Sequence, residues 1–341
     1  MDLEQRLRIL VVGGGLAGLA AAAYLRGRHD VTVLERFTLV DFARNDYAMS
    51  ITANTHRFLR ELGAEDWQLQ AVPLKYVWGC DAKGNVNESV AQSITPSGAT
   101  TIFARRSRIH KELLAAATGR GGTGTPATIR ENVKITSIDV EDGVIKTEDG
   151  REFRGDLIIG ADGVNSIVRT AILGPSAPSA SPSGVAAYLC TATSPDVWRI
   201  RDVDRMERWA KGKAVIVGDA AHAILPYFGL GCNLAIEDGE ALGYFLSNVT
   251  SASELPQALE RFTALRVARA HMVQLAGRQV AGLVSEEEKE SLPPFDGKAF
   301  MAKVYACGTG GSGGRGGQEG GAGGTGEGGK LHLEGRTLIN K

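Results

Sequence analysis

A glycine-rich turn near the amino terminus constrains the fold of this chain more than any other feature. Residues 8–12 (Arg-Ile-Leu-Val-Val) have the apolar, β-branched character of a buried parallel strand, and the alanine-rich run 19–25 predicts a helix. Glycines stand between them at positions 13, 15 and 18. In a GxGxxG turn the first glycine permits the tight bend, the second lets a pyrophosphate approach the backbone, and the third lets helix and strand pack closely. The free N–H groups and the dipole of the helix N-terminus also favour phosphate.

The residues after this helix supply the context that such a turn needs. A second strand is expected at residues 31–34, and it ends on Glu35, a carboxylate placed to accept the ribose hydroxyls of a dinucleotide. An ordinary strand–helix turn is the competing interpretation, and the strand, turn, helix and acid together favour nucleotide binding. At this point the nucleotide could be NAD or FAD.

Composition narrows the class of protein. The chain has 341 residues, 43% hydrophobic content and a net charge of −1, which describes a globular protein with room for two domains and no basic surface for nucleic acid. We expect no secretory signal and no membrane span, because no apolar run approaches about 18 residues. The widely spaced cysteines indicate reduced thiols in a cytoplasmic protein, with no disulfide framework and no metal site; they are Cys80, Cys190, Cys232 and Cys307.

Hydrophobic periodicity and turn signals predict the remaining elements. In chain order we expect a helix at 53–62, short strands between 71 and 103, a helix at 106–117, a hairpin over 133–140 and 143–147, a strand at 157–159, a strand at 214–217, and helices at 234–247 and 255–283. The tail from 308 to 329 has 14 glycines in 22 residues, and we expect it to be disordered.

Two of these strands end in turns that carry an acid beside glycine. The strand at 157–159 leads into Gly160-Ala161-Asp162-Gly163, and the strand at 214–217 leads into Gly218-Asp219-Ala220-Ala221-His222. A third turn, from Pro226 to Asn233, precedes the helix at 234–247.

The GxGxxG turn with Glu35, the Asp-Gly turn and the Gly-Asp turn, in this order, resemble the single-component FAD-dependent aromatic hydroxylases, and most of all their salicylate hydroxylase-like branch. The resemblance covers residues 6 to about 190 and 198 to about 305. It implies an α/β fold, in which a Rossmann-like FAD-binding domain with a parallel sheet and helices accompanies a β-rich substrate domain.

The resemblance also implies which residues hold the cofactor. Residues of the first motif would hold the ADP half of FAD: Gly13, Gly15, Leu16, Ala17, Gly18, Glu35 and Arg36. Arg106 matches the flavin-contacting arginine, Asp162 and Gly163 match a motif near FAD and the incoming nicotinamide, and Asp219 matches the carboxylate that accepts bonds from the flavin's hydroxyls. The turn beside the flavin ring would include Pro226, Gly229, Gly231, Cys232 and Asn233. No side chain is assigned as catalytic, and we interpret His222 as structural rather than as a base.

The reaction that the resemblance implies uses NADH or NADPH as a transient co-substrate and O2. The reduced flavin forms a C4a-hydroperoxide that hydroxylates a small aromatic substrate, phenolic or an aromatic acid. The start of the helix at 234–247, with its N–H groups and dipole, is suited to stabilise negative charge on the flavin. We expect a monomer or a homodimer.

The sequence departs from the family between its second and third motifs. Only 56 residues separate Asp162 from Asp219, where the family places most of its substrate sheet, and what remains around 185–200 has room for two strands of about 5–6 residues each. We hypothesise an internal deletion with its junction between Leu189 and Trp198, and therefore poorly coupled hydroxylation. A smaller departure lies at residues 46–50, where many relatives carry a glycine.

These observations predict a discontinuous domain organisation. The FAD-binding domain would comprise residues 1–72, 104–174 and 210–290, the truncated substrate domain 73–103 and 175–209, a C-terminal extension 291–307, and the tail 308–341. A non-catalytic FAD- or nucleotide-binding remnant of the family is the main alternative function. An NAD-dependent dehydrogenase is a weaker one, since it needs neither the Asp-Gly nor the Gly-Asp motif.

Overall fold

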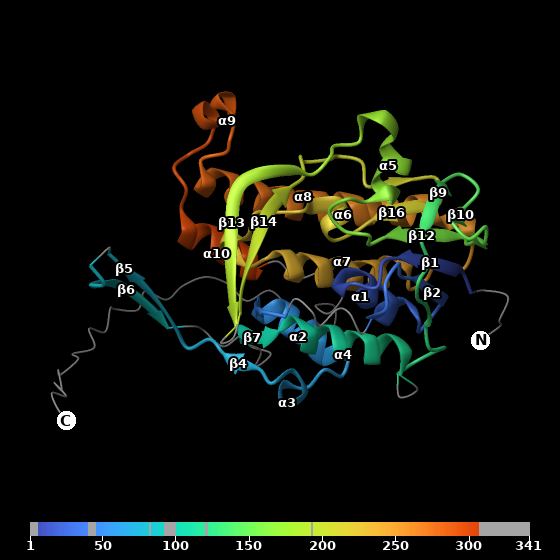
Figure 1. Cartoon of the computed structure of the whole chain (residues 1–341), viewed down its shortest axis with the longest axis horizontal. Helices are drawn as coiled ribbons and strands as arrows, with labels where there is room; N and C mark the ends of the chain where they lie inside the picture. Colours follow the sequence, from blue (N-terminus) through green and yellow to red (C-terminus); the bar gives the residue numbers. More distant parts are fainter. Residues whose placement is uncertain are drawn as a thin grey trace, which may run out of the picture. The chain divides into compact units, whose positions relative to one another are not determined.

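The computed structural model describes residues 6–39, 46–81, 83–91, 100–119, 122–191 and 194–306 (Figure 1). Residues Met1–Thr309 form one compact unit. The glycine-rich tail lies outside the described residues, and the domain boundaries expected from the sequence stay predictions.

A six-stranded sheet, parallel except at one edge, is the centre of this unit. Its strands, in spatial order, are β15 (Ala210–Lys211), β16 (Ala214–Ile216), β12 (Leu157–Gly160), β1 (Arg8–Val12), β2 (Asp30–Leu34) and β8 (Thr128–Arg130). The inner strands β12 and β16 are buried along their whole length, as is β1 except at Arg8, which explains their continuous apolar sequences. The edge strands β8 and β15 are short and were not expected from the sequence.

The register of the parallel strands brings their carboxyl ends level with one another. Val12 of β1 lies opposite both Leu34 of β2 and Gly160 of β12, and Gly160 lies opposite Ile216 of β16. The turns that follow these strands therefore share one edge of the sheet, the edge where open α/β sheets bind ligands.

Successive side chains of β1 pack against different elements on the two faces of the sheet. Val11 points toward Gly18 of α1 (Leu16–Leu25), and Leu10 points toward Gly155, which follows β11 (Glu152–Arg154). Successive residues of a strand face opposite ways, so α1 and the antiparallel sheet β9–β11 lie on opposite faces. That small sheet also contains β9 (Ile135–Asp139) and β10 (Val144–Thr147), close to the predicted hairpin.

Helices form the layer on the α1 side. Helix α1 packs against α4 (Arg106–Thr118) and α7 (Gly231–Leu246), and α7 packs in turn against α8 (Leu255–Ala281) (Figure 1). Two helices begin three residues earlier than their apolar patterns predicted, α1 at residue 16 and α7 at residue 231. The remaining helices are α2 (Ala53–Glu61), α3 (Asp66–Leu69), α5 (Ile167–Leu173), α6 (Asp219–His222), α9 (Glu286–Ser291), α10 (Gly297–Ala306) and the 3₁₀ turns Gly174–Ser176, Pro226–Phe228 and Ala252–Glu254.

The β-rich segments form separate small sheets. These are β3 (Ala48–Ile51) with β7 (Ile102–Arg105) and β4 (Val72–Pro73), the hairpin of β5 (Tyr76–Cys80) and β6 (Val86–Ala91), and the hairpin of β13 (Ser181–Thr191) and β14 (Ser194–Asp202). The last hairpin lies between the second and third motifs, in the interval that the sequence predicted to be shortened, and its strands of 11 and 9 residues are longer than the sequence predicted. The α/β fold with a parallel sheet and an additional β-rich part is confirmed.

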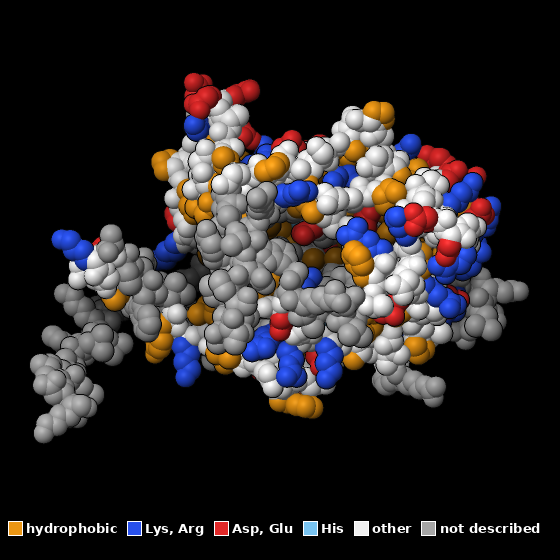
Figure 2. Space-filling view, in the orientation of Figure 1, with side chains coloured by type: hydrophobic (Ala, Val, Ile, Leu, Met, Phe, Trp, Pro, Cys, Tyr) orange, Lys and Arg blue, Asp and Glu red, His pale blue; other side chains and the backbone are white. Residues whose placement is uncertain are grey.

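Charges are interspersed on the surface. Figure 2 shows blue and red side chains mixed on the visible face, as expected for a net charge of −1. Among the described residues, no helix combines the length and the apolar character needed to cross a membrane.

The glycine turn gives a direct test of the β1–α1 packing. A Cβ at Gly18 would lie 1.9 Å from the carbonyl oxygen of Gly13, whereas a Cβ at Gly15 meets no protein atom within 4 Å. We expect Gly18→Ala to lower the free energy of unfolding by about 1–3 kcal/mol, as overpacking does. Gly15→Ala should change it by less than about 0.5 kcal/mol. Urea denaturation of the FAD-free proteins checks this, and equal stabilities for the two variants would contradict it.

Candidate functional site: a cavity at the carboxyl edge of the sheet

The turn after β1 adopts the strained form that its glycines allow. Gly13 has a φ of +105°, and its N–H donates to the carbonyl oxygen of Leu34 (2.9 Å), which ties the turn to β2. Gly15 is the N-cap residue of α1. No described side chain accepts a hydrogen bond from the first N–H groups of this helix, and its first turn contains no acid. The open space beside Gly15 and the uncapped N–H groups suit an anion such as a pyrophosphate.

Side chains hold Gly14 from both sides. The carboxylate of Glu35 accepts from the Gly14 N–H (2.6 Å) and from the Phe37 N–H (2.9 Å). The imidazole of His110 on α4 contacts the carbonyl oxygen of Gly14 through Nε2 (2.8 Å). Burial lowers the pKa of His110, so the ring is neutral at pH 7 and Nε2 carries the proton that it donates.

The contact between His110 and Gly14 was not expected from the sequence. A histidine inside an otherwise ordinary amphipathic helix gives no local signal of a partner 96 residues away. Phe37 was also missed; the guanidinium of Arg36 stacks on its ring, 4.6 Å from the ring centre.

A cavity of about 530 Å³ opens at this edge of the sheet. Gly13, Gly15, Glu35, Arg106 and Asp162 line it, so five predicted residues from separate parts of the sequence meet around one space. Arg36 and Gly163 also line it. A hollow of about 590 Å³ between residues 207–212 and α8 carries none of the predicted residues, so size alone does not identify the site.

The Asp-Gly turn is fixed by its own carboxylate. Asp162 accepts from the Ser166 hydroxyl (2.5 Å) and from the N–H groups of Ile167 (2.7 Å) and Val168 (3.2 Å), and thus caps α5. Burial raises the pKa of Asp162, against the lowering effect of these bonds. The side chain therefore shapes the turn while it also faces the cavity.

Arg169 joins the Asp-Gly turn to the Gly-Asp turn. Its guanidinium is buried and donates to the carbonyl oxygens of Val164 (2.7 Å) and Ala220 (3.0 Å). This bridge between two predicted motifs was missed, because it depends on the packing of α5 against α6.

A second group of charged and polar side chains contains Asp219, Arg106, Tyr47 and Cys232. Burial is the main cause of each shift: it raises the pKa of Asp219, raises that of Tyr47, lowers that of Arg106 and raises that of Cys232 to about 12. Asp219 keeps substantial accessible surface and has Arg106 as a charged neighbour, but it is not among the residues that line the cavity described above. The Arg106 guanidinium lies 6.0 Å from the centre of the Tyr47 ring, and Tyr47 was not predicted.

The turn from Pro226 to Gly231 ends at the start of α7. Gly229 has a φ of +62°, and among the described residues no side chain caps α7, whose first turn also carries no acid. The amide of Asn233 donates to the carbonyl oxygens of Ser50 (2.9 Å) and Gly229 (2.8 Å) and accepts from the Thr52 N–H (2.8 Å). The side chain of Asn233 thus positions this turn against β3, and its expected role as a cofactor contact stays a prediction.

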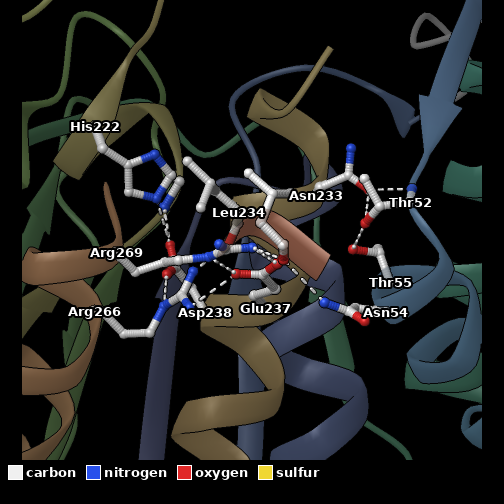
Figure 3. A network of polar contacts seen from close by, with 12 residues as sticks. Thr52, Asn54, Thr55, His222, Asn233, Leu234, Glu237, Asp238, Arg266 and Arg269 are labelled. Atoms are coloured by element: carbon white, nitrogen blue, oxygen red, sulfur yellow. Dashed lines mark hydrogen bonds and ion pairs between the residues drawn. The ribbon is translucent and has the colours of Figure 1, made fainter. Parts of the chain in front are cut away.

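A buried ionic network lies behind the Gly-Asp turn (Figure 3). Asp238 of α7 contacts His222 (2.7 Å), accepts from the Gly218 N–H (2.8 Å) and pairs with Arg266 of α8 (2.7 Å). Arg266 also pairs with Glu237 (3.0 Å), as does Arg269. His222 is fully buried, and its ring packs on that of Trp209. Its contacts support the structural interpretation of this residue.

Comparisons with known proteins identify the family of this chain. The model of the family described as "FAD binding domain" matches residues 6–200 and 191–275. Hispidin-3-hydroxylase of Neonothopanus nambi is 25% identical over 80% of this chain and 88% of its own length. The 3-amino-4-hydroxybenzoate 2-monooxygenase PtmB3 of Streptomyces platensis is 25% identical over 81% of this chain and 88% of its own.

Solved structures show the same fold. The structure of Klebsiella pneumoniae HpxO complexed with FAD and uric acid superimposes with a TM-score of 0.65 at 18% identity, over 88% of this chain and 92% of that one. The chain therefore belongs to the FAD binding domain family, in the branch of FAD-dependent monooxygenases that the motifs resemble.

Proposed function

We propose that this protein hydroxylates a small aromatic substrate, a phenol or an aromatic acid, with FAD, O2 and NADH or NADPH. The observation that carries the proposal is the meeting of three distant motifs, at residues 13–18, 162–163 and 218–219, along one edge of a parallel sheet. The hydroxybenzoate named for the Streptomyces relative supports an aromatic substrate.

The residues at this edge fit FAD. The open space at Gly15 and the uncapped start of α1 accept the pyrophosphate, and Glu35 is placed for ribose hydroxyls. Arg106 and Asp219 offer a cation and an acceptor to the flavin half. When bound, FAD supplies the redox chemistry that takes electrons from the nicotinamide and activates O2. The uncapped N–H groups at the start of α7 are suited to stabilise negative charge on the cofactor.

The alternatives receive less support. Relatives matched over 88% of their own length carry hydroxylase or monooxygenase names, which does not favour a non-catalytic remnant. A dehydrogenase is not favoured either, because the matching family is an FAD family. The cytoplasmic location and the monomeric or homodimeric state stay predictions from the sequence.

The comparisons also support the shortened substrate region. The family model matches in two segments that overlap at 191–200, within the hairpin β13–β14. The match to the hispidin hydroxylase runs over 372 aligned positions yet uses only 80% of this 341-residue chain, so the relative has stretches without a counterpart here. Loss of the sheet strands from the substrate side would leave the reacting centre open to water.

Cofactor retention is the first test of this proposal. We expect the purified protein to keep a visible flavin absorbance band after desalting, or to regain it when FAD is added. Gly15→Ala is the matched variant: its Cβ enters the space left for the pyrophosphate, so FAD affinity should fall by about tenfold or more, equivalent to 1.4 kcal/mol, while the fold is kept. Absence of the band from the folded wild-type protein, even after reconstitution, would contradict the proposal.

His110 gives a second test, because it holds the carbonyl group of Gly14 away from the anion site. Without the donor, that carbonyl can rotate toward the phosphates and repel them. We expect His110→Leu to weaken FAD binding by about five- to tenfold, the value of one hydrogen bond, and His110→Gln to keep most of the affinity. Titration of the FAD-free proteins, followed by quenching of flavin fluorescence, measures both. Equal affinities for the Leu and Gln variants would exclude this role.

The shortened interval predicts uncoupled turnover. With NADH or NADPH and either salicylate or 3-amino-4-hydroxybenzoate, we expect most of the reducing equivalents to appear as hydrogen peroxide rather than as hydroxylated product. The reason is that a site open to water does not retain the activated oxygen until it reaches the substrate. Peroxide formation, product formation and NAD(P)H consumption are measured in the same samples. One product per nicotinamide oxidised would show that the remaining strands form a complete substrate site.

A further inference from the structure

A small apolar cluster, separate from the main core, lies against the turn that precedes α7. Its buried members come from three helices and the turn itself: Leu230, Leu234, Val273, Ala276, Phe300 and Val304. Phe228 in the turn packs on Phe300 (4.6 Å between ring centres) and on Phe295 (5.6 Å). Phe295 and Phe300 also contact each other at 5.8 Å. The three rings thus join the turn to α10 and to the residues just before it.

Helix α10 is held by side chains as well as by this cluster. Arg269 of α8 donates to the carbonyl oxygen of Val304 (3.1 Å), and Asn54 of α2 donates to the carbonyl oxygens of Val304 (3.2 Å) and Tyr305 (3.3 Å). These carbonyl groups belong to the last turn of α10, where no N–H of the same helix is in position to donate to them. The two side chains therefore serve as the C-terminal cap of α10.

The same side chains connect α10 to the rest of the site (Figure 3). Arg269 pairs with Glu237 on α7, and Glu237 pairs with Arg266, which reaches Asp238 behind the Gly-Asp turn. Asn54 lies two residues after Thr52, whose N–H binds the Asn233 amide. The turn is consequently fixed from two directions, through Asn233 on the β3 side and through Phe228 on the α10 side.

We propose that α10 clamps the Pro226–Gly231 turn and the first turn of α7, with Phe300 and Val304 as positioning residues for the flavin. The inference rests on the proposed function, which locates the flavin at this turn. It assigns a role to residues 295–305, which lie beyond the part of the chain matched by the family model. Within the turn Gly229 has a positive φ, and the start of α7 has no side-chain cap among the described residues. Leu230 and Leu234 place the turn and this helix start against α8 and α10, so loss of the α10 side chains removes one wall of their packing.

Amide hydrogen exchange of the FAD-free full chain tests the clamp without relying on the cofactor. We expect Phe300→Ala to increase exchange in peptides that cover 226–236 by tenfold or more, and to leave peptides that cover 13–19 unchanged. Phe300→Leu should restore most of the protection. Phe153→Ala is the matched control, because Phe153 of β11 is equally large and packs against the main core on the opposite face of the central sheet, outside the small cluster.

FAD titration and the flavin reduction potential provide the functional readout. Phe300→Ala should weaken FAD binding by tenfold or more and move the potential of the bound flavin to a more negative value, since a displaced helix start stabilises the reduced anion less. The control should lower the thermal stability but leave both quantities as in the wild type. Unchanged exchange at 226–236, or equal effects of Phe153→Ala, would overturn the clamp. Failure of the wild-type protein to bind FAD would contradict the proposed function instead, and exchange would still decide whether α10 holds the turn.

Discussion

The in-register parallel pairing of β1 with β2 and β12, and of β12 with β16, decides where every part of the candidate site lies. Val12, Leu34, Gly160 and Ile216 stand side by side, so the turns that follow them open onto the same edge. A shift of one residue in any of these pairs would turn its buried side chains to the opposite face. The strands are apolar on both faces, so the register depends on close packing such as that of Gly18 on Val11 and of Gly160 on Val168. This register places the glycine turn, Glu35, Asp162 and Asp219 at the same edge of the sheet.

The turns themselves are held by buried polar side chains from helices. Glu35 and His110 fix the Gly14 peptide, Arg169 joins the Asp-Gly turn to the Gly-Asp turn, and Asp238 holds the Gly218 N–H. The buried ionic network pairs two carboxylates with two guanidinium groups, so its charges balance; its members are Asp238, Glu237, Arg266 and Arg269. Such a group stabilises little compared with apolar residues of equal volume, and removing one member leaves a buried charge that costs about 3–5 kcal/mol. Its contribution is the fixed relation between α7, α8 and the turn before α6.

The sequence was sufficient to predict the features whose signals are local. Strand, glycine turn, helix and acid follow one another within residues 8–35, and the Asp-Gly and Gly-Asp turns each follow a short apolar strand. Contacts between distant residues gave no such signal: His110, Arg169 and Tyr47 stand in segments with ordinary local patterns. The partners of the Asn233 amide were not visible in the sequence for the same reason, since they lie in β3 and directly after it. The early start of α7 was missed because Gly231 and Cys232 are poor helix formers and stand before the apolar pattern begins.

The hairpin β13–β14, within the interval between Asp162 and Asp219, contributes no strand to the described part of the central sheet. The residues that line the cavity or carry the motifs come from positions up to 167 and from 218 onward, and the central sheet closes by pairing β12 directly with β16. The hairpin β13–β14 lies between these two strands in the sequence but adds no strand to the central sheet. A change in its length therefore leaves the register of the parallel strands as it is. For this reason we expect FAD binding and coupled hydroxylation to be separate properties of this chain, so that the first can be complete where the second is not.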